Sequence, residues 1–187
     1  MILRDSHFQF DDRCLSHSGA IIDIGCYSWD WSQWFLDNGK RVIGFDLNEV
    51  RQPAGAELRK QAVMPFDGKV LIRANNDVDA TVMPMWNSTG QEIQSVSLGS
   101  ILKEFPMPAL IKMNVEGAEY PLLFSLKEPP ADQLIVSFHD FAPYFPYSKH
   151  LSQTVRNYLS VWYNWSETCP EYSWWMGLLK EEFRGVK

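Results

Sequence analysis

The sequence predicts an α/β fold, an open and mostly parallel sheet with helices on both faces and a C-terminal β-hairpin. Two observations support this prediction. Short apolar runs at residues 20–24, 41–45, 109–113 and 134–138 alternate with helix-length segments. The tail, residues 164–181, has the pattern of two strands joined by a turn. Such alternation is typical of units in which a helix connects two parallel strands.

The first unit has the form of half a nucleotide-binding site. A strand at residues 20–24 ends at Gly25, a helix with aromatic residues on one side follows, and a second strand at residues 41–45 ends in Asp46. A glycine lets the backbone approach a ligand, and a carboxylate at this position can accept hydrogen bonds from ribose hydroxyls. The unit therefore predicts a Rossmann-like site. A helix–strand packing unit without a ligand is the alternative.

The dinucleotide fingerprint GxGxxG is missing from this unit. Gly25 is followed by Cys26, Tyr27, Ser28 and Trp29, so the second glycine is absent. A pyrophosphate needs close backbone approach at that point. The pattern favours S-adenosylmethionine, which carries no phosphate, and disfavours a nicotinamide-dependent oxidoreductase.

The middle of the chain predicts a helical patch at residues 54–62 and a third strand of the sheet at residues 69–72. An edge strand at residues 79–86, an extended segment at residues 93–98 and a short helix at residues 100–105 follow. The third strand would deliver a polar cluster to the ligand cleft, namely Asn75, Asn76 and Asp77. These side chains are either turn formers or groups that read an adenine edge.

In the second half, the strands at residues 109–113 and 134–138 are each followed by a helix, the first ending near Leu126 and the second at residues 149–161. Lys112 lies among apolar neighbours, so we expect it to pair with a carboxylate. Ligands of open α/β sheets bind outside the carboxyl ends of the strands. That rule selects the residues just past each strand: Gly25 to Tyr27, Asp46, Asn75 to Asp77, Asn114 to Glu116, and His139.

Composition restricts the class of protein. A chain of 187 residues, 45% hydrophobic and 21% charged, is expected to form a single domain over residues 1–187, with residues 1–18 as a short leading helix or a flap. The net charge of −6 argues against nucleic-acid and anionic-membrane partners. Three scattered cysteines and the lack of a signal peptide or a long apolar run predict a cytoplasmic protein without structural zinc.

Two motifs resemble those of the FkbM methyltransferases. That family carries an early Asp-x-Gly-Ala-Asn-x-Gly and a later Lys-x-Asp-Val-Glu-Gly-x-Glu. The later motif stands here as KMNVEGAE at residues 112–119 and departs from the pattern at Asn114. The early motif reads DIGCYSW at residues 23–29, with Trp29 in place of the last glycine. The indole could narrow the cleft or stack on a ligand.

The segment SVSLGSIL at residues 95–102 and the pair Phe138-His139 also look like that family, so the resemblance runs from about Gly19 to His139. It implies a class I methyltransferase-like fold, S-adenosylmethionine as cofactor, and methyl transfer to a hydroxyl oxygen of a sugar or small natural product. The implied cofactor contacts are Asp23, Gly25, Cys26 and Tyr27 for the methionine part, Asp46 for the ribose, and Asn76 or Asp77 for the adenine.

Asn114 replaces the family's aspartate. It can still hydrogen-bond an ammonium or a hydroxyl, but it is a poorer ligand for a hard divalent cation, so we expect no metal. For the general base we expect His139 first, since an imidazole titrates near neutral pH, and Glu116 second. The alternatives are a strand-end histidine bonded to backbone, and glutamates (Glu116, Glu119) that merely favour a helix N-terminus.

A binding module that keeps the fold without turnover is the competing function. The degenerate glycine loop and Asn114 motivate it. The sequence leaves the acceptor and the oligomeric state open.

Overall fold

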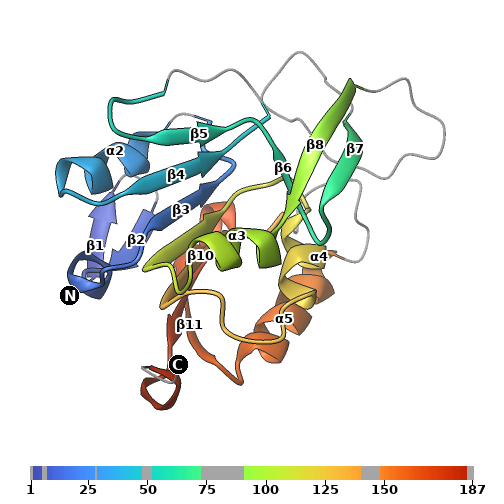
Figure 1. The fold of residues 1–187 in the computed structure, drawn as a ribbon. Coiled ribbons are helices and arrows are strands. Elements are labelled where there is room, and N and C mark those ends of the chain that lie inside the picture. Colours follow the sequence, from blue (N-terminus) through green and yellow to red (C-terminus); the bar gives the residue numbers. More distant parts are fainter. Residues whose placement is uncertain are drawn as a thin grey trace.

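The computed structural model describes residues 2–5, 8–27, 29–47, 52–72, 91–139 and 148–184. Its centre is a sheet with seven strands in the spatial order β11-β12-β10-β9-β3-β4-β5 (Figure 1). All are parallel except β12, which runs antiparallel to both of its neighbours. The strands are β3 (Ile21–Ile24), β4 (Val42–Phe45), β5 (Glu57–Arg59), β9 (Leu110–Met113), β10 (Gln133–Ser137), β11 (Tyr163–Cys169) and β12 (Trp174–Leu179). The predicted fold class and the C-terminal hairpin are confirmed.

Both faces of this sheet are covered, which explains why its strands are continuous apolar runs rather than alternating ones. Ile22 and Ile24 of β3 pack in one core cluster with side chains of α3, α4 and α5. Ile21 of the same strand points to the other face and belongs to a second cluster with Phe35 of α2. The helices are α1 (Arg13–Ser16), α2 (Asp30–Asp37), α3 (Leu98–Glu104), α4 (Glu119–Phe124) and α5 (Ser148–Leu159).

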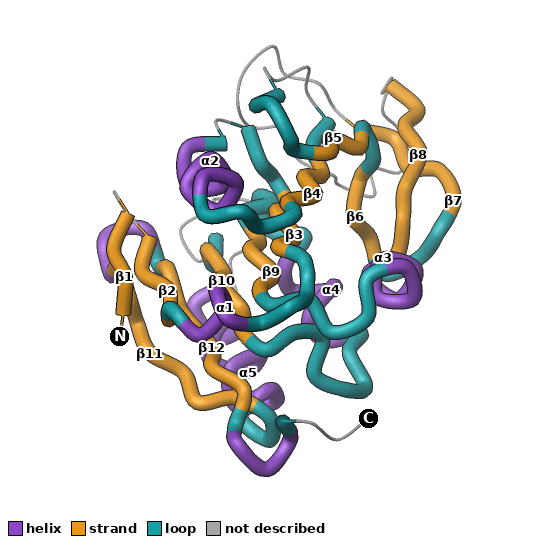
Figure 2. Tube along the Cα trace, turned by 60° about the vertical axis from the view of Figure 1, so that its left-hand side comes forward, coloured by secondary structure: helices purple, strands orange, loops and turns teal. Residues whose placement is uncertain are grey.

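The N-terminal segment forms a hairpin of β1 (Ile2–Asp5) and β2 (Phe8–Asp11), followed by the single turn of α1. Phe10 is buried against Trp34 and Phe35 of α2, with ring centroids 5.0 and 4.8 Å apart. The hairpin lies beside β11 and β12 (Figure 2), and Gln9 Nε2 donates to the Thr168 carbonyl at 3.0 Å. This segment, predicted as a leading helix or a flap, thus covers part of the α2 face of the sheet.

The predicted third strand of the main sheet is wrong. Residues 69–72 belong to β7 (Gly68–Ile72), which pairs antiparallel with β8 (Gln91–Ser97) in a separate sheet completed by β6 (Ala62–Met64). The strand that pairs with β4 in the main sheet is instead β5, which lies inside the segment predicted as a helical patch, residues 54–62. Pairing with β4 overrides a local helix propensity that is weak where glycine interrupts it. The expected strand at residues 79–86 lies outside the described residues.

The remaining elements agree with the prediction to within a few residues: α3 for the helix at residues 100–105, α4 for the helix after the second motif, and α5 for the helix at residues 149–161. Two short 3₁₀ turns, Pro170–Tyr172 and Glu181–Phe183, join β11 to β12 and follow β12. Among the described residues, no helix combines the length and apolar character needed to cross a bilayer.

Candidate functional site

Gly25 joins the carboxyl end of β3 to the loop beyond it, at the point where the order of the sheet reverses between β3 and β9. Its φ of +77° lies in the left-handed region, and a Cβ here would stand 2.0 Å from the Asn114 carbonyl oxygen. The Gly25 amide donates to Phe45 O at 2.8 Å, and the Asn114 amide donates to Ile24 O at 3.0 Å. Only glycine fits between these two strand ends.

A buried ion pair supports this loop from below. Lys112 Nζ lies 3.0 Å from Asp23 Oδ1 and also donates to the Gly25 carbonyl, while Ser32 Oγ donates to Asp23 Oδ2 at 2.7 Å. All three side chains are buried, and Asp23 is fully inaccessible. The expected partner of Lys112 is therefore Asp23. The geometry makes this carboxylate a support for the loop rather than a surface that a ligand touches.

Asp46 fastens the other side of the loop. Its Oδ2 accepts a hydrogen bond from the Tyr27 amide at 3.0 Å, and the side chain of Tyr27 is half exposed. Cys26 between them points inward, where burial raises the pKa of its thiol and keeps it protonated. Three loop residues are predicted to contact the cofactor. Gly25 is half-buried and Tyr27 is half exposed at the carboxyl edge of the sheet, while Cys26 packs in the core.

Trp29 takes the backbone conformation that the family's glycine would supply, with φ 59° and ψ 10°. Its ring lies on Gly44 of β4, where an added Cβ would be 2.3 Å from Trp29 Cη2. The side chain is buried in the α2-side cluster. The expectation that this indole narrows the cleft or stacks on a ligand is wrong, because packing over a glycine directs the ring into the core.

Glu116, Glu119 and His139 form a three-residue ion-pair network at the carboxyl ends of β9 and β10. Glu119 Oε1 lies 2.9 Å from His139 Nδ1 and also accepts from the His139 amide at 2.9 Å. Glu116 Oε1 lies 3.1 Å from Nε2 on the other side of the ring. Glu116 itself has a φ of 49°, in a tight turn with Gly117. Its side chain is 31% exposed, whereas His139 is 3% exposed and Glu119 is fully buried.

The network changes the proton chemistry expected of the histidine. Burial alone would lower the pKa of His139, but the hydrogen bonds and charges of Glu116 and Glu119 outweigh it and raise the pKa to about 10. The ring is therefore an imidazolium at neutral pH, not the near-neutral imidazole that the sequence suggested. A protonated ring with both nitrogens bonded to carboxylates has no lone pair with which to accept a proton.

Two features of this edge do not follow from the sequence: the hydrogen bond of Ser32 to Asp23, and the pairing of Glu119 with His139. The sequence favours a helix-terminal acid at Glu119, although its place in the second motif is a usable signal. Nothing in the sequence marked Ser32. Asn114 is half-buried, with its main chain against Gly25, and Asn75, Asn76 and Asp77 lie outside the described residues. The described residues contain no group of three or more histidine, cysteine, aspartate or glutamate side chains placed to hold a metal ion.

Comparison with known families agrees with this geometry. The model of the methyltransferase FkbM domain matches residues 23–162, from the first buried aspartate to the turn after α5. Comparison with curated proteins finds no match. The matched segment contains every part of the carboxyl edge described above, and it spans well over half of the 187 residues. The chain belongs to the FkbM methyltransferase family.

Proposed function

We propose that this methyltransferase transfers a methyl group from S-adenosylmethionine to a hydroxyl oxygen of a sugar or small natural product. The observation that carries the proposal is the convergence, at one edge of the sheet, of a glycine loop, a strand-end carboxylate and a partly exposed glutamate. Membership of the FkbM family supports a methyl donor of this kind. The proposal adds the donor's identity, the oxygen acceptor and the roles of the residues.

The loop and the strand-end acid fit the donor. Asp46 at the end of β4 has the position from which a carboxylate accepts bonds from ribose hydroxyls, and its bond to the Tyr27 amide holds the loop beside it. Gly25 and Tyr27 would line the methionine part, while Lys112 and Asp23 keep the loop in place from the interior. When bound, S-adenosylmethionine supplies an electrophilic methyl group on a sulfonium sulfur.

The chain's own contribution to the chemistry is alignment and proton removal. Glu116 is the member of the ion-pair network that an acceptor can reach, because its side chain is 31% exposed and that of His139 is 3% exposed. We therefore assign Glu116 to receive the hydroxyl proton at its carboxylate. His139 and Glu119 would hold Glu116 in place, so the order of the two candidate bases is the reverse of that expected from the sequence.

Calorimetric titration with S-adenosylmethionine, S-adenosylhomocysteine and NAD tests the first part of the proposal. We expect micromolar binding of both sulfur nucleosides and none of NAD. An acceptor screen on hydroxylated compounds, read out as S-adenosylhomocysteine formed, tests the second part. Failure of both nucleosides to bind would overturn the assignment of the donor.

Glu116→Gln separates the proton acceptor from the binding site. We expect binding of the nucleosides to be retained and transfer to fall by about 10²–10⁴-fold, the usual contribution of a general base. Glu128→Gln is the matched control, since Glu128 is an exposed glutamate after α4 and takes no part in the network. Full transfer in Glu116→Gln would remove Glu116 from the mechanism.

A binding module without turnover is the second candidate, and Asn114 in place of the family's aspartate is the observation that favours it. It predicts nucleoside binding with no transfer to any acceptor. Trp29 no longer supports it, because the left-handed backbone of the family's glycine is retained and the ring is in the core.

A further inference from the structure

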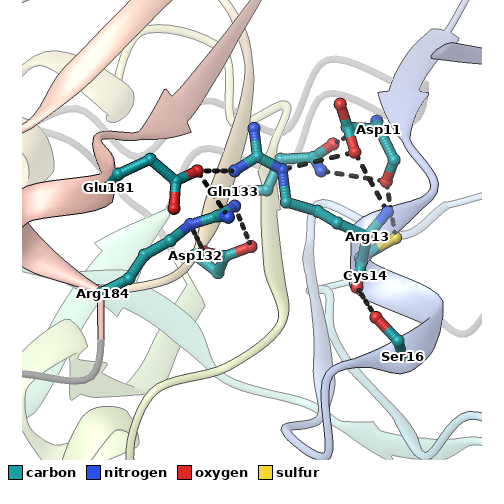
Figure 3. A network of polar contacts seen from close by, with 8 residues as sticks. All are labelled: Asp11, Arg13, Cys14, Ser16, Asp132, Gln133, Glu181 and Arg184. Atoms are coloured by element: carbon teal, nitrogen blue, oxygen red, sulfur yellow. Dashed lines mark hydrogen bonds and ion pairs between the residues drawn. The ribbon is translucent and has the colours of Figure 1, made fainter. Parts of the chain in front are cut away.

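A pocket lies at the opposite edge of the main sheet, at the amino ends of β3, β9 and β10. Its volume is about 310 Å³, and its charged walls are Arg13 of α1, Arg184 after the last 3₁₀ turn, and Asp132 just before β10 (Figure 3). None of these residues takes part in the carboxyl-edge site. Met107 and Leu179 add an apolar wall. The pocket thus combines two guanidinium groups with apolar surface.

The two arginines share one carboxylate oxygen. Arg184 Nη1 donates to Glu181 Oε1 at 2.8 Å, and Arg13 Nη1 lies 4.0 Å from the same oxygen (Figure 3). Each arginine is also fixed from behind by its own carboxylate. Arg184 Nε lies 3.1 Å from Asp132 Oδ1, and Arg13 Nε lies 3.3 Å from Asp11 Oδ1. The guanidiniums are therefore positioned independently of Glu181.

The three charged groups differ in how firmly the fold holds them. The side chain of Glu181 is 82% exposed, against 22% for Arg13 and 29% for Arg184. An ion pair with so exposed a member contributes little to stability and is easily replaced. Glu181 thus occupies a position between two built-in guanidiniums that another anion could take.

A histidine also lines the same pocket. His17 Nδ1 accepts a hydrogen bond from the Gly19 amide at 2.9 Å, which leaves Nε2 as the ring nitrogen that can donate. His17 lines the pocket together with Ser16. Two guanidiniums and an imidazole N–H are the donor types that bind carboxylates and phosphates.

We propose that this pocket binds the phosphate or carboxylate group of a small organic molecule, with the anion replacing Glu181 between Arg13 and Arg184. The apolar wall of Met107 and Leu179 would contact the carbon skeleton of the ligand. This site is separate from the proposed methyl-transfer site and does not depend on it.

Titration with inorganic phosphate, and separately with acetate, at constant ionic strength tests the site, with the melting temperature and calorimetry as readouts. We expect a saturable response in the wild type. The anion that binds with the higher affinity, phosphate or acetate, identifies the group that the pocket prefers. Glu181→Gln removes the internal competitor, so affinity should rise by up to about five-fold, the size of a surface ion pair. Arg13→Gln should reduce affinity at least about ten-fold, since it removes a charge-assisted contact.

Two surface controls separate this site from general charge effects. Glu57 pairs with Arg59 at 2.5 Å and with Arg41 at 3.0 Å, and none of these three residues lines the pocket. We therefore expect Glu57→Gln and Arg41→Gln to leave anion affinity unchanged. An equal gain in Glu57→Gln, an equal response in Arg13→Gln and wild type, or no saturable response in Glu181→Gln would each overturn the proposal. Circular dichroism of each variant confirms that it is folded.

Discussion

The two edges of the main sheet carry ion pairs of opposite character. At the carboxyl edge, the Asp23–Lys112 pair has side chains 0% and 5% exposed, and Glu119 clamps a histidine that is 3% exposed. At the amino edge, Arg184 pairs with a glutamate that is 82% exposed. Buried pairs need their partners, because an uncompensated charge in the interior is costly, whereas exposed pairs can exchange partners with water or ligand. The carboxyl edge therefore holds one geometry, whereas at the amino edge the exposed Glu181 can exchange while Asp132 and Asp11 keep the two arginines in position.

The largest effect should come from Lys112→Met, which strands the Asp23 carboxylate in the interior. We expect a loss of about 3–5 kcal/mol in the free energy of unfolding, the usual result of breaking a buried pair. Lys69→Met is the control, because Lys69 and Glu92 form a pair 2.6 Å apart with both side chains 58% exposed. Urea denaturation of both variants measures the contrast. Equal losses would erase the distinction between buried and exposed pairs.

The pH dependence of stability should report the His139 network. Its folded pKa of about 10 lies above the ordinary value of 6.5, so its stabilisation is complete below about pH 6.5 and is lost as pH rises through about 10. The full change is on the order of 3–5 kcal/mol. His139→Gln should lack this alkaline loss. An NMR titration of the His139 ring gives its pKa directly. A midpoint near 6.5 would mean that Glu116 and Glu119 do not stabilise the protonated ring.

Gly25→Ala should cost about 2–4 kcal/mol, because it combines a left-handed backbone with a clash against the Asn114 carbonyl. Gly39→Ala isolates the first contribution, since Gly39 has φ +74° and nothing within 4 Å of an added Cβ. We expect Gly39→Ala to lose only about 1 kcal/mol. Denaturant unfolding measures both, and equal losses would mean that close approach at Gly25 is unimportant.

Gly44→Ala should lose about 1–3 kcal/mol, because its new methyl group meets the Trp29 ring. In a Trp29→Gly background the same change should cost less, since the ring is gone and Cys26 Sγ, 2.8 Å from the added Cβ, is the close atom that remains, while glycine suits φ 59°. A double-mutant cycle in urea gives the coupling free energy. A coupling near zero would show that the indole does not pack on β4.

The smallest effect should be that of Glu181→Gln on stability, below about 1 kcal/mol, because its partner arginines keep Asp132 and Asp11. Thermal unfolding at low and high salt measures it. A loss comparable to that of Lys112→Met would mean that Glu181 is structural, and the amino edge would then resemble the carboxyl edge.

Much of the carboxyl edge could be predicted because its signals are local. Apolar runs ending in Gly25, Asp46 and His139 place these residues at strand ends, and a parallel sheet brings strand ends to one edge. β5 could not be predicted, since Glu57–Arg59 is a half-buried edge strand without alternation, and only its pairing with β4 makes it a strand. Local propensity is a weak guide where tertiary pairing decides.

The sequence by itself determined the α/β class, the order of the main units and the candidate residues at the carboxyl edge, because periodicity and motifs depend on neighbours along the chain. Only the tertiary structure decided that Asp23 pairs with Lys112, that the Trp29 ring packs on Gly44, and that His139 is an imidazolium between two glutamates. These properties depend on burial and on partners from other elements. Charge interactions and packing act through space, so the sequence names the groups and the fold sets their chemistry.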